Sequence, residues 1–317
     1  MRSRIKSALK ALFQTSSTNV DEQKLDESAT EELSEGPFSV VKNLDVNGKV
    51  FRLRGDAYLG RMEHGFEPGL THLFNKIAES VQPGSCLDVG ANIGITAHLL
   101  SGLYEHVYCF EASPRTFKIL KENLLNNNIN NVTTFPIGLG KEPTTFTLTA
   151  ANNDASGGFL SDNLSADLEG HTKESVEIST GDDLLESIRE TNQTPIRFIK
   201  LDIEGHELEA LAGLKKTLKK YSPVVVLEMN HWCLNAFKRL SVPEFLETLD
   251  TYFPAILAFD DSRHELVDIS AGKDSGRYHV MHEHIVHNRF PTLIASRDIE
   301  TLKNLKTTLS RPQGQLL

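Results

Sequence analysis

The chain has 317 residues, of which 39% are apolar and 24% are charged, enough for one large domain or two small ones. Its formal net charge of −10 argues against nucleic acid as the main partner, because phosphate binding needs a basic surface. No run approaches the roughly 18 apolar residues of a membrane span, and the three cysteines have no CxxC spacing. We therefore expect a cytoplasmic protein with buried thiols.

The first 36 residues are expected to lie outside the folded domain as a flexible extension. Residues 2–13 place apolar side chains on one helical face among basic residues. This pattern favours a frayed terminus, with weak docking to a membrane surface or a protein as the alternative. Residues 15–36 are acidic and contain few large apolar groups, which predicts a disordered linker.

The next elements alternate between strands and helices. An Asn47-Gly48 pair between apolar runs predicts a hairpin, and a helix follows over about 69–80. The stretch Cys86–Thr96 reads as a buried strand, a Gly-rich turn and a helix that continues to about residue 101. Further strands are expected at about 106–110, 132–137, 198–201 and 223–228, with helices over about 114–125, 183–191, 206–219 and 243–252. This alternation predicts an α/β fold with a doubly wound, mostly parallel sheet.

Residues 141–181 interrupt the alternation. Thr144–Thr149 and Ser175–Thr180 alternate like half-buried strands, and a polar loop from Asn152 to Gly158 lies between them. We expect an inserted β-hairpin with a long excursion at the carboxyl edge of the sheet. It either shapes a substrate pocket or is a surface insertion without a catalytic role.

The end of the chain is expected to contribute strands at about 254–259 and 277–287, with a short one near 265–269. The domain is placed at residues 37–295, and residues 296–317 are expected to form a helical, then frayed, tail. Alternation in the 277–287 strand would put His282 and His284 on one face and His279 and His287 on the other. No acid or cysteine completes a recognisable ligand set with them, so we expect no metal.

The Gly-rich turn has the features of a nucleoside-binding site. Gly90 and Gly94 bracket it, and the helix that it opens presents unpaired N–H groups. Glu111 ends the next strand about 20 residues later, where an acid hydrogen-bonds a ribose diol in nucleoside-binding α/β folds. Asn92 stands in place of the middle glycine of G-x-G-x-x-G, which disfavours a dinucleotide.

Several motifs together resemble the FkbM-type methyltransferase family over about residues 46–290. The resemblance implies a Rossmann-like class I methyltransferase fold, S-adenosyl-L-methionine as the donor, and a hydroxyl acceptor on a sugar, glycan or secondary metabolite. Ala112 and Gly181 depart from the family pattern, which commonly has proline and leucine there, but neither removes a functional side chain. The motifs are Asp88-Val-Gly-Ala-Asn-Ile-Gly94, Phe110-Glu-Ala-Ser-Pro114, Asn123, Thr180-Gly-Asp-Asp183 and Ile199-Lys-Leu-Asp-Ile-Glu-Gly-His-Glu207.

Under this resemblance we expect Glu111 to accept both ribose hydroxyls and the N–H groups of residues 90–94 to face the cofactor. Asp88 is expected to hold the cofactor's amino group, or alternatively to tie the turn to its own backbone. Asn123 either touches the adenine or caps its helix. The expected cofactor-binding residues are Glu67, Asp88, Gly90, Asn92, Gly94, Glu111, Asn123 and Asp202.

A hydroxyl acceptor has a pKa far above 7, so a general base near the methyl group is useful. The strand ends offer Asp202, Glu204, His206, Glu228 and His231. Glu204 and His206 are the first choices for the catalytic role and His231 the next, while Asp202 is expected to lie nearest the sulfonium. For His206 the alternative is a surface position on a helical turn.

Three classes of function remain in competition. An S-adenosylmethionine-dependent O-methyltransferase is the leading one. A non-catalytic binding protein that keeps the cofactor fold is the second, and a nicotinamide-dependent oxidoreductase, disfavoured by Asn92, is the third. The sequence has no acceptor-specific feature, so a protein acceptor is also open, and it indicates no oligomeric state.

Overall fold

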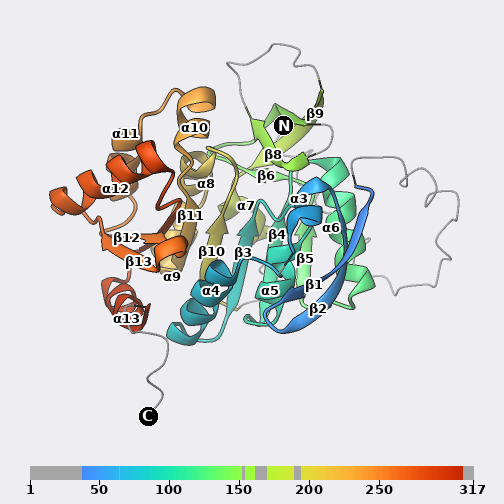
Figure 1. Ribbon diagram of the computed structural model, residues 1–317, viewed down its shortest axis with the longest axis horizontal. Coiled ribbons are helices and arrows are strands. Elements are labelled where there is room, and N and C mark those ends of the chain that lie inside the picture. Colours follow the sequence, from blue (N-terminus) through green and yellow to red (C-terminus); the bar gives the residue numbers. More distant parts are fainter. Residues whose placement is uncertain (1–37, 64, 152–153, 161–169, 189–193, 310–317) are drawn as a thin grey trace, which may run out of the picture. The chain divides into compact units, whose positions relative to one another are not determined.

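The structure, a computed structural model, describes residues 38–63, 65–151, 154–160, 170–188 and 194–309. The expectations for residues 1–36, for Asn152 and Asn153 and for residues 310–317 therefore lie outside the described residues. The described residues all fall within one compact unit. They form an eight-stranded sheet, a four-stranded sheet and a two-stranded hairpin (Figure 1).

The eight-stranded sheet has the order β13-β12-β14-β11-β10-β3-β4-β5. Its strands from β11 to β5 are all parallel, and the other three add an antiparallel edge. The predicted doubly wound, mostly parallel sheet is confirmed. The strands are β3 (Ser85–Val89), β4 (His106–Phe110), β5 (Val132–Phe135), β10 (Ile196–Leu201), β11 (Val224–Glu228), β12 (Ala255–Asp260), β13 (Glu265–Asp268) and β14 (Thr292–Ser296).

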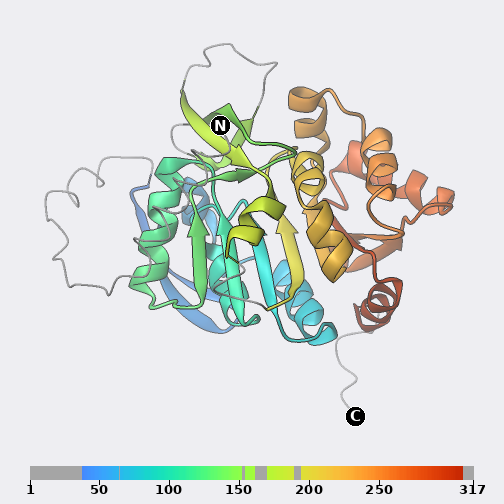
Figure 2. The ribbon, with the colours of Figure 1, turned by 180° about the vertical axis from the view of Figure 1, so that it is seen from behind.

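Helices cover both faces of this sheet, as the front and back views show (Figures 1 and 2). On one face, Leu73, Leu99, Leu120 and Leu305 from four helices share a single hydrophobic core. These helices are α4 (Pro68–Ser80), α5 (Ile95–Ser101), α6 (Pro114–Asn126) and α13 (Ile299–Leu309). The opposite face carries α7 (Gly181–Ile188), α8 (Glu207–Gly213) and α9 (Lys215–Tyr221).

Shorter elements complete the unit. The predicted hairpin is confirmed as β1 (Val40–Val46) and β2 (Lys49–Gly55), and Asn47 and Gly48 between them have φ of 57° and 77°. Positive φ at both turn residues matches the twist of the two strands. The remaining helices are α3 (Ala57–Arg61), α10 (His231–Cys233) with the π-helix Leu234–Lys238, α11 (Val242–Asp250), the 3₁₀ turn Asp261–Arg263 and α12 (Asp274–His287).

The insertion is larger than the sequence predicts. Its β7 (Thr144–Ala151) and β9 (His171–Ser179) pair antiparallel as expected. The segment predicted as a loop also contains β8 (Asp154–Leu160), which pairs with β7, and β6 (Gly138–Leu139) pairs with β9. The insertion is therefore a four-stranded sheet.

One expectation for the end of the chain is wrong, and one strand there was not predicted. Residues 277–287 form part of the helix α12, in which the buried residues Val280 and His284 are one helical turn apart. The predicted division of four histidines between two strand faces therefore does not occur. The strand β14 was not predicted, yet it pairs with both β11 and β12 inside the sheet.

The topology determines where a ligand can enter. From β3 the chain proceeds to β4 and β5 on one side, whereas β10 and β11 lie on the other side. In doubly wound sheets such a switch point leaves a crevice outside the carboxyl ends of the strands. Among the described residues, the helices are too short or too polar to cross a bilayer. Cys86, Cys109 and Cys233 are buried and unpaired, as predicted.

Candidate active site

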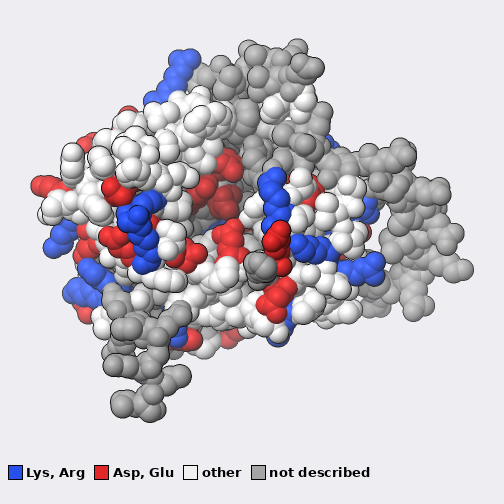
Figure 3. Space-filling view, in the orientation of Figure 1, with Lys and Arg blue, Asp and Glu red and all other residues white. Residues whose placement is uncertain are grey.

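A cavity of about 440 Å³ opens at the carboxyl ends of β3, β4, β10 and β11. Figure 3 shows acidic side chains gathered near the middle of this face of the molecule. Leu148, Ala150 and Ile178 of the inserted sheet form part of the wall, so the insertion shapes the pocket. The predicted site residues that line the cavity are Glu67, Gly90, Asn92, Glu111, Asp202, Glu204 and His206. Asp88, Gly94, Asn123 and His231 are not among its lining residues.

The turn after β3 requires glycine for a steric reason. Gly90 has a φ of 78°, and a Cβ at this position would lie 2.0 Å from the carbonyl oxygen of Asp202. Only a residue without a side chain lets the ends of β3 and β10 approach this closely. Gly94 has a φ of 93° as the cap of α5, and a Cβ there would contact Leu120 at 2.7 Å. It supports the turn from behind the cavity.

The amide groups of this turn are used within the chain. The N–H groups of Gly90 and Ala91 both donate to the Phe110 carbonyl at 3.0 Å, and that of Gly94 donates to Ala91. The N–H of Asn92 donates to Glu111 Oε2 at 2.9 Å. The expectation that the N–H groups of residues 90–94 face a cofactor is therefore wrong for these four residues.

Glu111 lies at the tip of β4 and faces the cavity. Its Oε2 accepts from Asn92 and its Oε1 accepts from the N–H of Ser113 at 2.9 Å. Each carboxylate oxygen has a second lone pair, so both can still accept from a ligand. Burial raises the pKa of Glu111 to about 7, against the lowering effect of these hydrogen bonds.

Lys200 was given no role from the sequence, yet it joins three parts of the site. The parallel register places it beside Asp88 on the neighbouring strand. Its Nζ donates to the Gly90 carbonyl at 2.9 Å and lies 3.4 Å from Asp88 Oδ1 and 3.3 Å from Asp202 Oδ2. The sequence does contain a signal for this role, namely a lysine within the mainly apolar strand Ile196–Leu201. A buried ammonium needs carboxylate partners, so such a lysine indicates acids nearby.

Asp88 is fully buried behind the cavity. Its Oδ2 accepts from the Thr96 hydroxyl at 2.7 Å, and its Oδ1 faces Lys200. The side chain thus ties the strand to the first turn of α5 and fixes the lysine. A direct contact with a cofactor does not fit this position, whereas the alternative structural role does.

Asn123 likewise acts within the fold. Its Oδ1 accepts from the N–H of Arg54 at 2.8 Å, and its Nδ2 donates to the carbonyls of Arg54 at 2.9 Å and Ile93 at 2.8 Å. These three bonds use both N–H groups of the amide and one lone pair of its oxygen, and they join β2 to the Gly-rich turn. Glu67, by contrast, faces the cavity and accepts from the Tyr58 hydroxyl at 2.7 Å.

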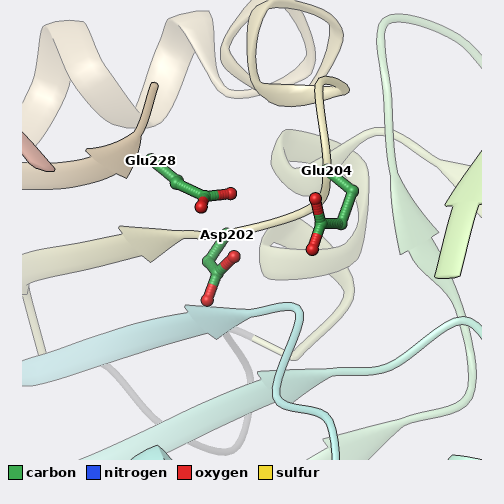
Figure 4. Close-up of side chains that lie close together, drawn as sticks. All are labelled: Asp202, Glu204 and Glu228. Carbon is green, nitrogen blue, oxygen red and sulfur yellow. The ribbon is translucent and has the colours of Figure 1, made fainter. Parts of the chain in front are cut away.

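Three carboxylates converge on one side of the cavity (Figure 4). Asp202 and Glu204 follow β10, and Glu228 ends β11; one oxygen of each lies within 4.8 Å of the others. Glu204 has a φ of 52°, which is uncommon for a residue with a side chain. Burial raises the pKa of Glu204 and of Glu228, and the neighbouring carboxylates raise both further.

The two predicted histidines differ in position. His206 is buried beside the cavity, and its Nδ1 is 2.7 Å from Lys238 Nζ. An ammonium only donates, so Nδ1 accepts and the proton of the neutral ring is on Nε2. Burial and the charge of Lys238 lower the pKa of His206 to about 3, which makes it a poor general base. Because His206 is buried, the alternative prediction that it lies at the surface on a helical turn is wrong.

His231 lies outside the cavity lining. The ring of His231 packs edge-on against that of His284, with ring centroids 4.9 Å apart. The backbone N–H of His231 donates to His284 Nε2 at 3.3 Å. The expected catalytic position of His231 is therefore not supported. Instead, the pair joins the start of α10 to α12.

Comparison with known proteins links this geometry to one family. A model described as the methyltransferase FkbM domain matches residues 88–263. The chain is 33% identical over 144 residues to the hexuronic acid methyltransferase AglP of Haloferax volcanii. This match covers 44% of the chain and 53% of AglP, so the chain spans about half the length of that curated relative.

Among the solved structures that the chain matches is a methyltransferase FkbM from Methylobacillus flagellatus, with a TM-score of 0.39 and 19% identity, covering 56% of this chain and 40% of that one. Another is an O-methyltransferase from Bacillus cereus in complex with SAH, with a TM-score of 0.39 and 15% identity, covering 76% of this chain and 86% of that one.

Proposed function

The chain belongs to the FkbM methyltransferase domain family, and from this premise we propose that it transfers a methyl group from S-adenosylmethionine to a hydroxyl oxygen of a sugar or related small molecule. The acceptor oxygen would attack the methyl carbon while the carbon–sulfur bond breaks. S-adenosylhomocysteine would leave, and the hydroxyl proton would pass to a base. The observation that carries this proposal is the single cavity shared by the Gly90 turn, Glu111 and the carboxylates of β10 and β11.

Glu111 is the proposed anchor of the donor. Its two oxygens are held by backbone N–H groups of residues 92 and 113, so the carboxylate is oriented before a ligand binds. A ribose diol can donate to the remaining lone pairs of the two oxygens. Gly90, Glu67 and Asp202 line the same cavity.

Glu204 is the proposed base of the acceptor half. Its Oε2 accepts from Asn230 at 3.2 Å and from the Cys233 thiol at 3.0 Å, which leaves Oε1 for a ligand. Its raised pKa makes the carboxylate a better proton acceptor than an ordinary glutamate. His206, with its lowered pKa, is proposed to form the wall and to position neighbouring groups.

A hexuronic acid sugar is the first acceptor class that we propose to test. The support is the activity for which the relative AglP is named, and the match covers about half of that protein. Cavities of several hundred Å³ commonly accommodate small-molecule ligands, so a volume of about 440 Å³ is compatible with this class.

Calorimetric titration with S-adenosylhomocysteine tests the donor site. We expect the unchanged protein to bind, and Glu111→Gln to weaken binding about tenfold or more, because hydrogen bonds to a charged acceptor are lost. Glu247→Gln, an exposed acid on α11 outside the cavity, is the matched control and should bind normally.

The acceptor is tested by supplying radiolabelled donor to a panel of uronic acid sugars, neutral sugars and proteins. Label in a sugar would support the proposed reaction. No binding of S-adenosylhomocysteine by the unchanged protein would contradict it, and binding without transfer to any acceptor would favour a non-catalytic role.

A further inference from the structure

The carboxyl groups of Asp202, Glu204 and Glu228 form an acidic cluster with few partners in the protein. Their nearest oxygens lie within 4.8 Å of one another, a distance at which like charges repel. Within the described part of the chain, the cluster has one ion pair, from Lys200 to Asp202 at 3.3 Å. That lysine also faces Asp88, so its charge is shared.

Glu228 supplies a second, independent observation. Its Oε2 is shielded from solvent and has no hydrogen-bond partner among the described residues. Figure 4 shows that this side chain points from the end of β11 toward Asp202 and Glu204. Buried polar atoms are nearly always paired, so an unpaired carboxylate oxygen aimed into a cavity indicates a missing partner.

Glu204 is held in the orientation that a ligand to a cation needs. Both of its hydrogen-bond donors, Asn230 and the Cys233 thiol, bind Oε2, and Oε1 receives none of these bonds. Outer hydrogen bonds of this kind orient metal-binding carboxylates. Asp202, whose side chain is 48% exposed, keeps the other side of the cluster open to the cavity.

We propose that Asp202, Glu204 and Glu228 together bind one divalent cation that prefers oxygen ligands, Mg²⁺ or Mn²⁺. Such cations lie about 2.0 to 2.2 Å from their oxygens in octahedral geometry, so oxygens at adjacent positions are about 3 Å apart and those at opposite positions about 4 to 4.5 Å apart. The observed spacing closes to this range with small side-chain movements. The cluster consists of carboxylates, the ligands that suit these cations.

The cation determines which acceptors fit, a step that rests on the proposed methyl transfer. Three protein ligands leave open positions toward the cavity, where two adjacent acceptor oxygens can bind. Vicinal diols and hydroxy acids present such oxygens, and both occur in uronic acid sugars. A bound cation also lowers the pKa of a coordinated hydroxyl. With the cation in place Glu204 acts as a ligand and not as the base, and the hydroxyl proton passes to solvent in the open cavity.

Titration of the full chain with Mn²⁺, after treatment with a chelator and without any donor, tests the site directly. Electron paramagnetic resonance measures free Mn²⁺, and Mg²⁺ should displace the bound ion. We expect one site, with affinity reduced roughly 100-fold or more in Glu228→Gln and in Asp202→Asn, since each removes a ligand. Glu204→Gln is a third variant that also removes a carboxylate ligand. Its amide oxygen can still accept from Asn230 and Cys233, so these two hydrogen bonds are kept.

Two controls separate the cation site from the donor site. Glu247→Gln should bind Mn²⁺ normally, and so should Glu111→Gln, although the latter loses affinity for S-adenosylhomocysteine. Absence of a Mn²⁺ site, or unchanged Mn²⁺ affinity in all three cluster variants, would overturn the cation proposal even where S-adenosylhomocysteine binds. Mn²⁺ binding at the cluster without binding of S-adenosylhomocysteine would support the cation site and contradict the proposed reaction.

Discussion

Lys200 shows how one side chain can position several parts of the site. Its buried ammonium neutralises Asp88 beneath the cavity, holds the carbonyl of Gly90 and approaches Asp202 at the rim. These contacts, and the charges of Asp202 and Asp88 above all, keep the pKa of Lys200 above its ordinary value despite burial. The lysine therefore stays charged and connects β3 to β10 where the Gly-rich turn begins.

Replacing Lys200 with methionine should lower the free energy of unfolding by about 3 to 5 kcal/mol. Methionine fills a similar volume, but Asp88 is left buried without a cation. Chemical denaturation at neutral pH measures the change. Lys216→Met is the matched control, since that side chain is 74% exposed, and it should change stability by about 0.5 kcal/mol at most. Equal effects of the two substitutions would show that the buried ion pair contributes little.

At the scale of elements, the turn from β3 into α5 determines the shape of the donor half. The turn crosses the end of β10, where the Asp202 carbonyl leaves no space for a side chain at Gly90. Its amides are occupied by Phe110 and Glu111, so the neighbouring strand β4 holds the turn in place. Two strand ends thus restrain it from opposite sides.

Gly90→Ala should be considerably more destabilising than Gly48→Ala. The two glycines have nearly the same φ, 78° and 77°, so both pay a similar cost of about 1 to 2 kcal/mol for a left-handed residue. Only at residue 90 would the added Cβ clash with backbone, because nothing lies within 4 Å of it at residue 48. Unfolding in denaturant compares the two variants. A difference below about 0.5 kcal/mol would mean that the strand ends separate easily.

The last helix, α13, belongs to the core of the protein. The sequence predicts a tail after residue 295, and this division remains a prediction. However, Leu302 and Leu305 of α13 are buried in the same core as residues of α4, α5 and α6. The preceding strand β14 lies between β11 and β12, so the end of the described chain completes the sheet.

Leu305→Ala should therefore reduce the free energy of unfolding by about 2 to 5 kcal/mol, as expected for a large-to-small change in a core. Unfolding should remain a single cooperative transition, because the helix and the sheet share that core. Lys303→Ala, at a side chain that is 64% exposed, is the control and should have little effect. A separate early transition in the leucine variant would indicate that α13 unfolds independently.

The sequence predicted the elements whose signals are local. The hairpin at Asn47-Gly48, the helix that begins at residue 114 and the strand His106–Phe110 were located correctly, because turn residues and apolar runs act over a few neighbours. The prediction of a strand at 277–287 was wrong because the histidines there have no clear period, and the helix buries only Val280 and His284. The strand Thr292–Ser296 was missed because a short apolar run does not show that it pairs with the distant strands β11 and β12.

For the site, the sequence alone determined the fold class, the family motifs, and the positions of Glu111, Asp202 and Glu204 at strand ends, since strand order along the chain sets which tips share an edge. Which side chains face the cavity and which support it from behind became known from the folded structure. It placed Asp88 against Lys200, removed His231 from the site, and brought Glu228 beside two other carboxylates. Register between strands that are distant in sequence controls these contacts, and a single chain's local patterns do not encode it.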